Sequence, residues 1–166
     1  MSKGLVASVA IFTLVMCSVF VFVNPVVLAD NPETFAEGEV FFSSNGEYDF
    51  KEFSLNDTNV NNFTVKFVQS GHTLIVDETG GKVINVIKYG NMVKSNKIHV
   101  KNFIDGELQK TNWMVDGVCV HEIEFSGGDR MYSACVKDTS SDTMIYVATP
   151  SEKETAGMIN SLTFNG

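Results

Sequence analysis

Short apolar runs separated by two-residue turn signals constrain the fold of this chain more than any other feature. Asn-Gly or Asp-Gly stands between such runs at Asn45-Gly46, Asp105-Gly106 and Asp116-Gly117. Both central residues of a tight hairpin turn need a positive φ, which Asn, Asp and Gly adopt most readily. The chain is therefore predicted to reverse direction repeatedly and to build antiparallel hairpins.

The second half of the chain predicts five consecutive strands in an antiparallel meander. Earlier in the chain, residues 63–67 alternate as a half-buried strand. Further hairpins are predicted around Asn45-Gly46 and around Thr79-Gly80-Gly81. The sheet should therefore hold about five to eight strands. The five strands of the predicted meander are 97–104, 107–115, 118–125, 130–136 and 143–149.

The last predicted element is a helix that packs on this sheet. Ser151 and Glu154 form a capping-box pattern, in which Ser151 caps the helix and the Glu154 side chain reaches back. Ala156, Ile159 and Leu162 then follow at a spacing of three, which gives the helix one apolar face. The sequence predicts one α+β domain, an antiparallel sheet packed by a C-terminal helix, with residues 30–39 as a loose lead-in.

The end of the chain resembles the end of PsbP-like domains. The resemblance rests on a final strand at 144–148, the capped helix and a closing Asn-Ser-Leu-Thr-Phe at 160–164. It covers about the last quarter of the chain and carries no catalytic residues, and the long helices found earlier in such domains are not evident. The chain also resembles small exported proteins of Lys- and Asn-rich microbial genomes. Both resemblances imply a non-enzymatic extracytoplasmic module.

Residues 1–29 predict export. Lys3 precedes twenty uncharged residues, 4–23, and the segment ends in Val27-Leu28-Ala29 before Asp30. This pattern is typical of a signal peptide cut after Ala29. A signal core spans roughly 7–15 residues, whereas about 20 apolar residues can cross a bilayer, so an uncleaved anchor is the alternative. In both cases residues 30–166 form a single extracytoplasmic domain, either secreted or anchored to the plasma membrane.

The charge of the chain argues against nucleic-acid binding. There are 20 acidic residues against 12 basic ones, the formal net charge is −8, and Arg130 is the single arginine. Because no basic stripe is present, nucleic acid is excluded as a partner. The acidity remains compatible with solubility, cation association or a basic partner.

Cys119 and Cys135 predict a disulfide. If the hairpin between residues 118 and 136 has an odd-numbered loop, Val120 faces Ala134 and the two cysteines face each other. Directly opposed antiparallel residues lie within the Cα range of a disulfide, about 4.4–6.8 Å. An even cysteine count outside the cytoplasm usually means a bridge. Two free thiols are the alternative.

Other motifs give weaker signals. Asn56 and Asn62 each begin an Asn-x-Thr glycosylation pattern. The histidines, at positions 72, 99 and 121, lie on separate predicted strands without the closely spaced ligand pairs of zinc sites. We therefore predict no metal site, no cofactor and no nameable catalytic residue, although a Ser-His-Asp triad assembled from distant positions stays open.

An aromatic hairpin is the predicted interaction surface, with core packing as its alternative. Its residues are Phe41, Phe42, Tyr48 and Phe50. The leading functional hypothesis is a non-catalytic extracytoplasmic domain that binds a protein or cell-envelope component through its sheet or this hairpin. The alternative is a small-ligand or cation-binding accessory domain of the PsbP-like kind. A secreted hydrolase is the third possibility. It ranks below the other two because no acid, base and nucleophile converge in the sequence.

Overall fold

The structure, a computed structural model, describes residues 34–57, 62–69, 71–77, 79, 81–88, 90, 112–124 and 128–166. Several predicted features lie outside the described residues, namely the export segment 1–29, the strand 97–104, the turn at Asp105-Gly106 and His99. Within the described residues, no helix is both long enough and apolar enough to span a bilayer.

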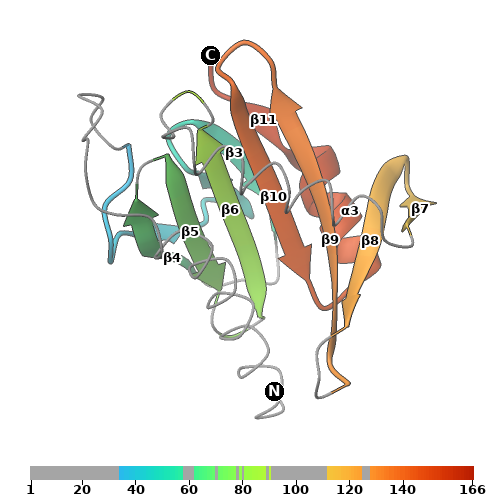
Figure 1. Ribbon diagram of the computed structural model, residues 1–166. Coiled ribbons are helices and arrows are strands. Elements are labelled where there is room, and N and C mark those ends of the chain that lie inside the picture. The colour runs from blue at the N-terminus through green and yellow to red at the C-terminus, as the bar shows by residue number, and fades with distance from the viewer. Residues whose placement is uncertain are drawn as a thin grey trace.

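The predicted fold class is confirmed, because the protein is an antiparallel α+β fold with two sheets and a C-terminal helix. Among the described residues, the large sheet has eight strands in the order β1-β4-β5-β6-β10-β9-β8-β7, and the small sheet has the order β11-β3-β2 (Figure 1). The strands of the large sheet are β1 Val40–Phe42, β4 Asn62–Gln69, β5 His72–Asp77, β6 Lys82–Lys88, β7 Asn112–Val115, β8 Val118–Glu124, β9 Arg130–Asp138 and β10 Thr143–Thr149. Those of the small sheet are β2 Glu47–Asp49, β3 Phe53–Asn56 and β11 Thr163–Phe164, and the helix is α3 Glu152–Ser161.

Two of the predicted turns have the expected backbone. Asn45 and Gly46 have φ values of 57° and 85°, and Asp116 and Gly117 have values of 48° and 83°. Two successive positive φ values match the right-handed twist of the strands on either side. The turn at Asp116-Gly117 joins β7 to β8, and Val115 pairs with Val118 across it.

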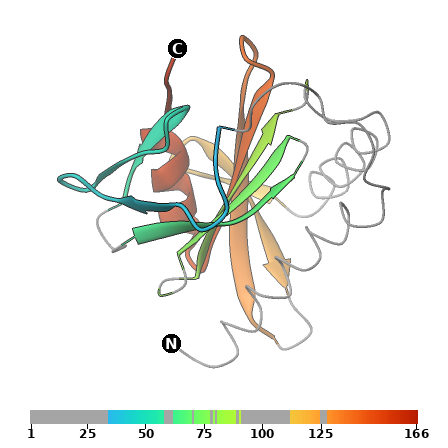
Figure 2. The ribbon, with the colours of Figure 1, turned by 90° about the vertical axis from the view of Figure 1, so that its left-hand side faces the viewer.

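The helix packs on one face of the large sheet and completes its core. Figure 2 shows α3 and the small sheet on the same side of the large sheet. Ala156 is fully buried and clusters with Val118, Val120 and Ala134, which is the face that the predicted hairpin register required. Met158, which the spacing-of-three pattern missed, enters the main core with Ile84, Ile145 and Val147.

The predicted aromatic interaction surface is wrong for three of its four residues. Tyr48 and Phe50 are fully buried, Phe41 is 9% exposed, and all three belong to the main core. The small sheet folds over the large one here, so these rings face inward. Tyr48 and Phe50 are stacked with centroids 6.0 Å apart, and Phe41 is tilted against Phe50 with centroids 5.0 Å apart. Only Phe42 is exposed, at 70%. Core packing, the alternative interpretation, therefore holds for Phe41, Tyr48 and Phe50.

The expected loose lead-in is also wrong for its described part, residues 34–39. Phe35 is 4% exposed and belongs to the main core. Lys88 Nζ donates to Thr34 Oγ1 at 2.8 Å, and the Gly38 amide donates to the Val65 carbonyl at 2.9 Å. A buried ring and hydrogen bonds to two strands hold this segment against the domain.

Substitutions at two glycines should change stability in opposite directions. Replacing Gly117 with alanine is expected to destabilise the protein by about 1 kcal/mol, because an L residue is strained at its φ of +83°. Replacing Gly157 in α3 with alanine should stabilise it by about 0.5–1 kcal/mol through helix propensity. A Cβ at either position meets nothing within 4 Å, so steric overlap does not contribute. Urea unfolding of both variants measures the two effects, and a loss of stability in both would contradict this account.

Candidate functional site

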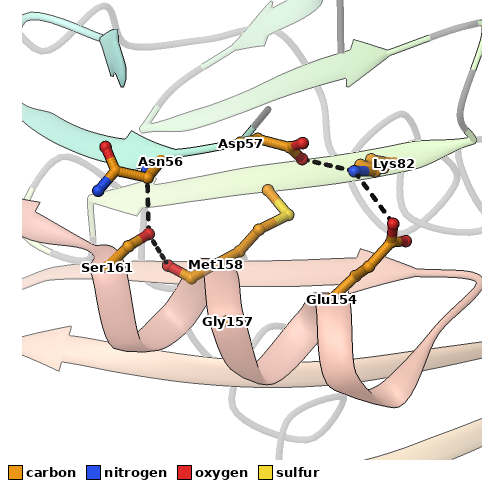
Figure 3. Close-up of a pocket in the computed structure, with 7 residues that line it drawn as sticks. All are labelled: Asn56, Asp57, Lys82, Glu154, Gly157, Met158 and Ser161. Carbon is orange, nitrogen blue, oxygen red and sulfur yellow. Dashed lines mark hydrogen bonds and ion pairs between the residues drawn. The ribbon is translucent and has the colours of Figure 1, made fainter. Parts of the chain in front are cut away.

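A cavity of about 280 Å³ lies between α3, the end of β3 and the start of β6 (Figure 3). It runs along the helix from its first turn to its last. The residues that line it are Asn56, Asp57, Lys82, Glu154, Gly157, Met158 and Ser161. These residues lie far apart in the sequence and are brought together because α3 packs across the strands.

A buried ion pair forms one end of the cavity. Lys82 Nζ donates to Asp57 Oδ2 at 2.5 Å, and each side chain is only 4% exposed. Glu154 lies on the other side of the ammonium, with Oε1 3.7 Å from Nζ and a side chain that is 36% exposed. Figure 3 shows Lys82 between these two carboxylates. A buried charge is tolerated only when it is paired, so the fold depends on the Asp57–Lys82 pair staying intact.

The position of Glu154 differs from the one that the capping box predicts. The Ser151 half of the prediction is confirmed, because its Oγ accepts the Glu154 amide at 3.4 Å. The Ser151 amide, however, donates to Thr149 Oγ1 at 3.1 Å. With that donor bonded to Thr149, the Glu154 carboxylate lies against Lys82 at the cavity.

The other end of the cavity joins the helix to the small sheet. Ser161 Oγ donates to the Met158 carbonyl at 3.0 Å and accepts the Asn56 amide at 2.9 Å. Met158 is buried at 3% exposure, whereas Gly157 is exposed and presents no side chain. The middle of the cavity is therefore open and apolar, between a charged end and a hydrogen-bonded end.

A second polar cluster, on the opposite face of the large sheet, is buried. His121 Nε2 lies 3.0 Å from Tyr146 Oη, which donates to Ser133 Oγ at 2.7 Å. Ser133 Oγ in turn lies 3.5 Å from the His121 carbonyl, which it can reach as a donor. All three side chains are at most 2% exposed. Tyr146 thus lies between the Ser133 hydroxyl and the His121 imidazole in this cluster.

His72 and Asn85 form a further buried pair on the same face as that cluster. His72 Nε2 lies 2.8 Å from Asn85 Oδ1, and both residues are fully buried. Burial lowers the pKa of His72 to about 4, although the hydrogen bond to Asn85 acts in the opposite direction. The imidazole is therefore neutral at physiological pH.

The depressed pKa of His72 predicts a pH dependence of stability. The unfolded chain binds a proton at His72 below about pH 6.5, whereas the folded protein does so only near pH 4. The unfolded state therefore binds more protons in this interval, and the free energy of unfolding should fall by about 2 kcal/mol from pH 7 to pH 5. The carboxyls of Glu39 and Asp138, whose pKa values are lowered from 4.5 and 3.8, titrate below this window. Urea unfolding at both pH values tests the prediction, and His72→Gln should lose this dependence.

The predicted cysteine register is confirmed, but the thiols are not joined in the structure. The β8–β9 ladder pairs His121 with Ser133 and Glu124 with Arg130 around a five-residue loop. Continued by two residues, the same register brings Cys119 opposite Cys135. Both are free thiols, Cys119 exposed and Cys135 partly buried. Burial and then the nearby Cys119 raise the pKa of Cys135. The disulfide remains a prediction.

The glycosylation candidates lie at opposite ends of a connection. Asn56 is exposed at the end of β3 and lines the cavity, whereas Asn62 is partly exposed at the start of β4, where it pairs with Phe42. Sequence reasoning missed Asp57, Lys82 and Glu154 as site residues. Their one sequence signal is a charge directly at a strand or helix end, which is also common on solvated surfaces. Among the described residues, no group of three or more His, Cys, Asp and Glu is placed to hold a metal ion.

No family model, no curated protein and no solved structure matches this chain.

Proposed function

We propose that this protein is a non-catalytic extracytoplasmic binding domain whose ligand site is the cavity beside α3. One observation carries the proposal: a cavity of about 280 Å³ is lined at one end by the buried Asp57–Lys82 pair and by Glu154. Ligand sites combine an apolar wall with a few placed polar groups. Met158 and Gly157 supply the wall here. The proposal agrees with a small-ligand or cation-binding accessory domain of the PsbP-like kind.

The cavity accounts for binding better than the aromatic hairpin does. Three of the four hairpin aromatics are used by the core, which leaves Phe42 as the exposed member. Phe42 and Val40, at 70% and 39% exposure, lie on β1, at the edge of the large sheet. This exposed edge favours a second candidate function, the docking of a protein or envelope component by strand addition.

The binding function can be tested by NMR. We expect at least one compound from a library of small polar molecules to shift the amide resonances of Asp57, Gly157 and Ser161 together in the purified protein. The amides of Ser140 and Ser141, in the turn between β9 and β10, serve as an internal control and should not move. If no compound moves the cavity resonances, the cavity is not a small-ligand site and the edge strand β1 becomes the leading candidate.

The location of the domain is part of the proposal. Export by residues 1–29 would place residues 30–166 outside the cytoplasm, either secreted after cleavage at Ala29 or held at the plasma membrane. Intact-mass measurement of the supernatant and the membrane fraction separates the two. A species that begins at Asp30 in the supernatant indicates secretion, whereas a full-length species in membranes indicates an anchor.

We further propose that Cys119 and Cys135 form a disulfide in the exported protein. Each thiol loses one proton and one electron, and an oxidised thiol–disulfide oxidoreductase outside the cytoplasm accepts both electrons and both protons. The native protein should weigh about 2 Da less before reduction than after it, and should react with an alkylating reagent at neither cysteine. Two alkylated cysteines in non-reduced native protein would contradict the bridge.

A further inference from the structure

We infer that the reduced Cys119–Cys135 pair, together with Met114, forms a binding site for one copper(I) ion at the β7 edge of the large sheet. The site shares no residue with the cavity beside α3, so the inference goes beyond the proposed binding function. The disulfide proposed above would consume both thiols, and the copper site therefore belongs to the reduced protein.

Three sulfur-bearing residues occupy one row across neighbouring strands. Figure 1 shows β7, β8 and β9 next to one another at one edge of the large sheet. Met114 on β7 pairs with Cys119 on β8. The β8–β9 register, which pairs His121 with Ser133, brings Cys119 opposite Cys135 when it is continued by two residues. Burial and then the charge of nearby Cys119 raise the pKa of Cys135, which agrees with two thiols that lie close together.

The three side chains share one face of the sheet, the face opposite α3. Val120 and Ala134 pack in one cluster with a residue of the helix. Because side chains alternate along a strand, their neighbours Cys119 and Cys135 point to the other face. Met114 is paired with Cys119 and therefore lies on that face too.

The spacing of the strands suits an ion held between two sulfur atoms. Opposed side chains on antiparallel strands have Cβ atoms about 4.5–5.5 Å apart. A metal–thiolate bond is about 2.3 Å long in zinc sites, so an ion in line between two thiolates separates the sulfur atoms by about 4.6 Å. Such an ion fits between Cys119 and Cys135 without a change in the backbone. The long, flexible side chain of Met114 supplies a thioether from the next strand.

The ligand set selects a soft ion of low coordination number. Thiolates and thioethers favour copper(I), zinc and iron–sulfur clusters. Structural zinc sites and the clusters use four protein ligands. Among the residues that the structure describes, no group of three or more His, Cys, Asp and Glu is placed to hold a metal ion. The nearby His121 is 2% exposed, and its Nε2 lies 3.0 Å from Tyr146 Oη. Two thiolates and one thioether therefore favour copper(I).

The row is open to solvent at the edge of the sheet. Met114 is 65% exposed, Cys119 is exposed and Cys135 is partly buried. Within the described part of the chain, no strand pairs with β7 on its outer side. An incoming ion thus meets the thioether and the exposed thiol first. On binding, two S–H bonds break, two Cu–S bonds form and two protons leave to solvent, while copper stays in the +1 state.

The test titrates copper(I) into the purified protein under nitrogen. The thiols are first reduced with a phosphine, which is then removed, and ascorbate keeps the copper in the +1 state. Bicinchoninate, a chelator that forms a coloured copper(I) complex, competes for the ion. We expect each chain to withdraw one copper(I) ion, measured as a loss of the colour of the complex. Protein alkylated at both thiols with iodoacetamide should withdraw none.

Variants identify the ligands. Cys119→Ser should weaken copper(I) binding at least about 100-fold, because even the loss of an outer-shell partner of a metal ligand costs about 10–100-fold. Since Cys119 is exposed, the thermal midpoint of this variant should stay unchanged. Met114→Leu keeps the apolar side chain but removes the sulfur, and should weaken binding about tenfold. Met144→Leu changes a partly exposed methionine that pairs with Lys137, outside the row, and should leave the affinity within about twofold.

Three outcomes would overturn the inference. The reduced protein could fail to withdraw copper(I) from the chelator. Alkylated protein or Cys119→Ser could bind as tightly as the unmodified chain, which would show general attraction of a cation to an acidic protein. Equal effects of Met114→Leu and Met144→Leu would remove the thioether from the site. Because copper(I) is diamagnetic, NMR can locate the ion: the amides of Cys119 and Cys135 should shift, whereas that of Gly157, at the cavity, should not.

Discussion

Replacing Lys82 with methionine is expected to lower the free energy of unfolding by about 3–5 kcal/mol, because the change leaves the buried Asp57 carboxylate without its ammonium partner. Methionine keeps most of the side-chain volume, so the loss reports the charge and not a cavity. Both members of the pair are only 4% exposed, so water screens the remaining carboxylate poorly. Urea unfolding followed by circular dichroism measures the change.

Two companion variants define what this loss means. Lys137→Met breaks an exposed pair, in which Lys137 Nζ lies 2.9 Å from Asp142 and both side chains are nearly half exposed. Its expected cost is within about 0.5 kcal/mol. The double variant Asp57→Asn with Lys82→Met should recover part of the loss, because no buried charge is left unpaired. A loss below about 1 kcal/mol for Lys82→Met alone would show that the pair is hydrated and not structural.

The second large effect is expected at Phe50. Phe50→Ala should destabilise the protein by about 3–5 kcal/mol, because this fully buried ring fills the space between the two sheets. Its centroid lies 4.8 Å from that of Phe53, 5.0 Å from Phe41 and 5.6 Å from Phe63. Neighbours on three sides cannot all collapse into the vacated volume. The thermal midpoint and the urea midpoint should both fall.

Phe42, on β1, provides the matched control. Phe42→Ala should change stability by less than about 0.5 kcal/mol, because 70% of this side chain is already in water. If β1 docks a partner, this variant should instead reduce that binding. Similar stability losses for the two phenylalanine variants would contradict the division between core and surface aromatics.

Local signals in the sequence predicted much of the fold. The positive φ values at Asn45-Gly46 and Asp116-Gly117 follow from the residues themselves. The cap at Ser151 is equally local, since its Oγ reaches an amide three residues away. The hairpin register followed from keeping Val120 and Ala134 on one apolar face, because a one-residue slip would turn every side chain to the other face.

The candidate site could not be predicted in this way. Lys82 and Asp57 are 25 residues apart, and Glu154 is a further 72 residues beyond Lys82 in the chain. Each reads in the sequence as an ordinary charge at the end of an element. They meet because α3, the end of β3 and the start of β6 come together around one cavity, an arrangement that no short window of sequence contains. The aromatic hairpin was misassigned for the same reason, since its rings are buried by a second sheet.

Within the described residues, the sequence by itself thus determined two of the hairpin turns, the strands that flank them, the start of the helix and the shared face of Val120 and Ala134. These properties depend on φ preferences, on side-chain alternation and on hydrogen bonds within a few residues. Only the tertiary structure decided which aromatic rings are core and which charges meet. Burial is a property of the partners that cover a residue, and here those partners lie tens of residues away along the chain.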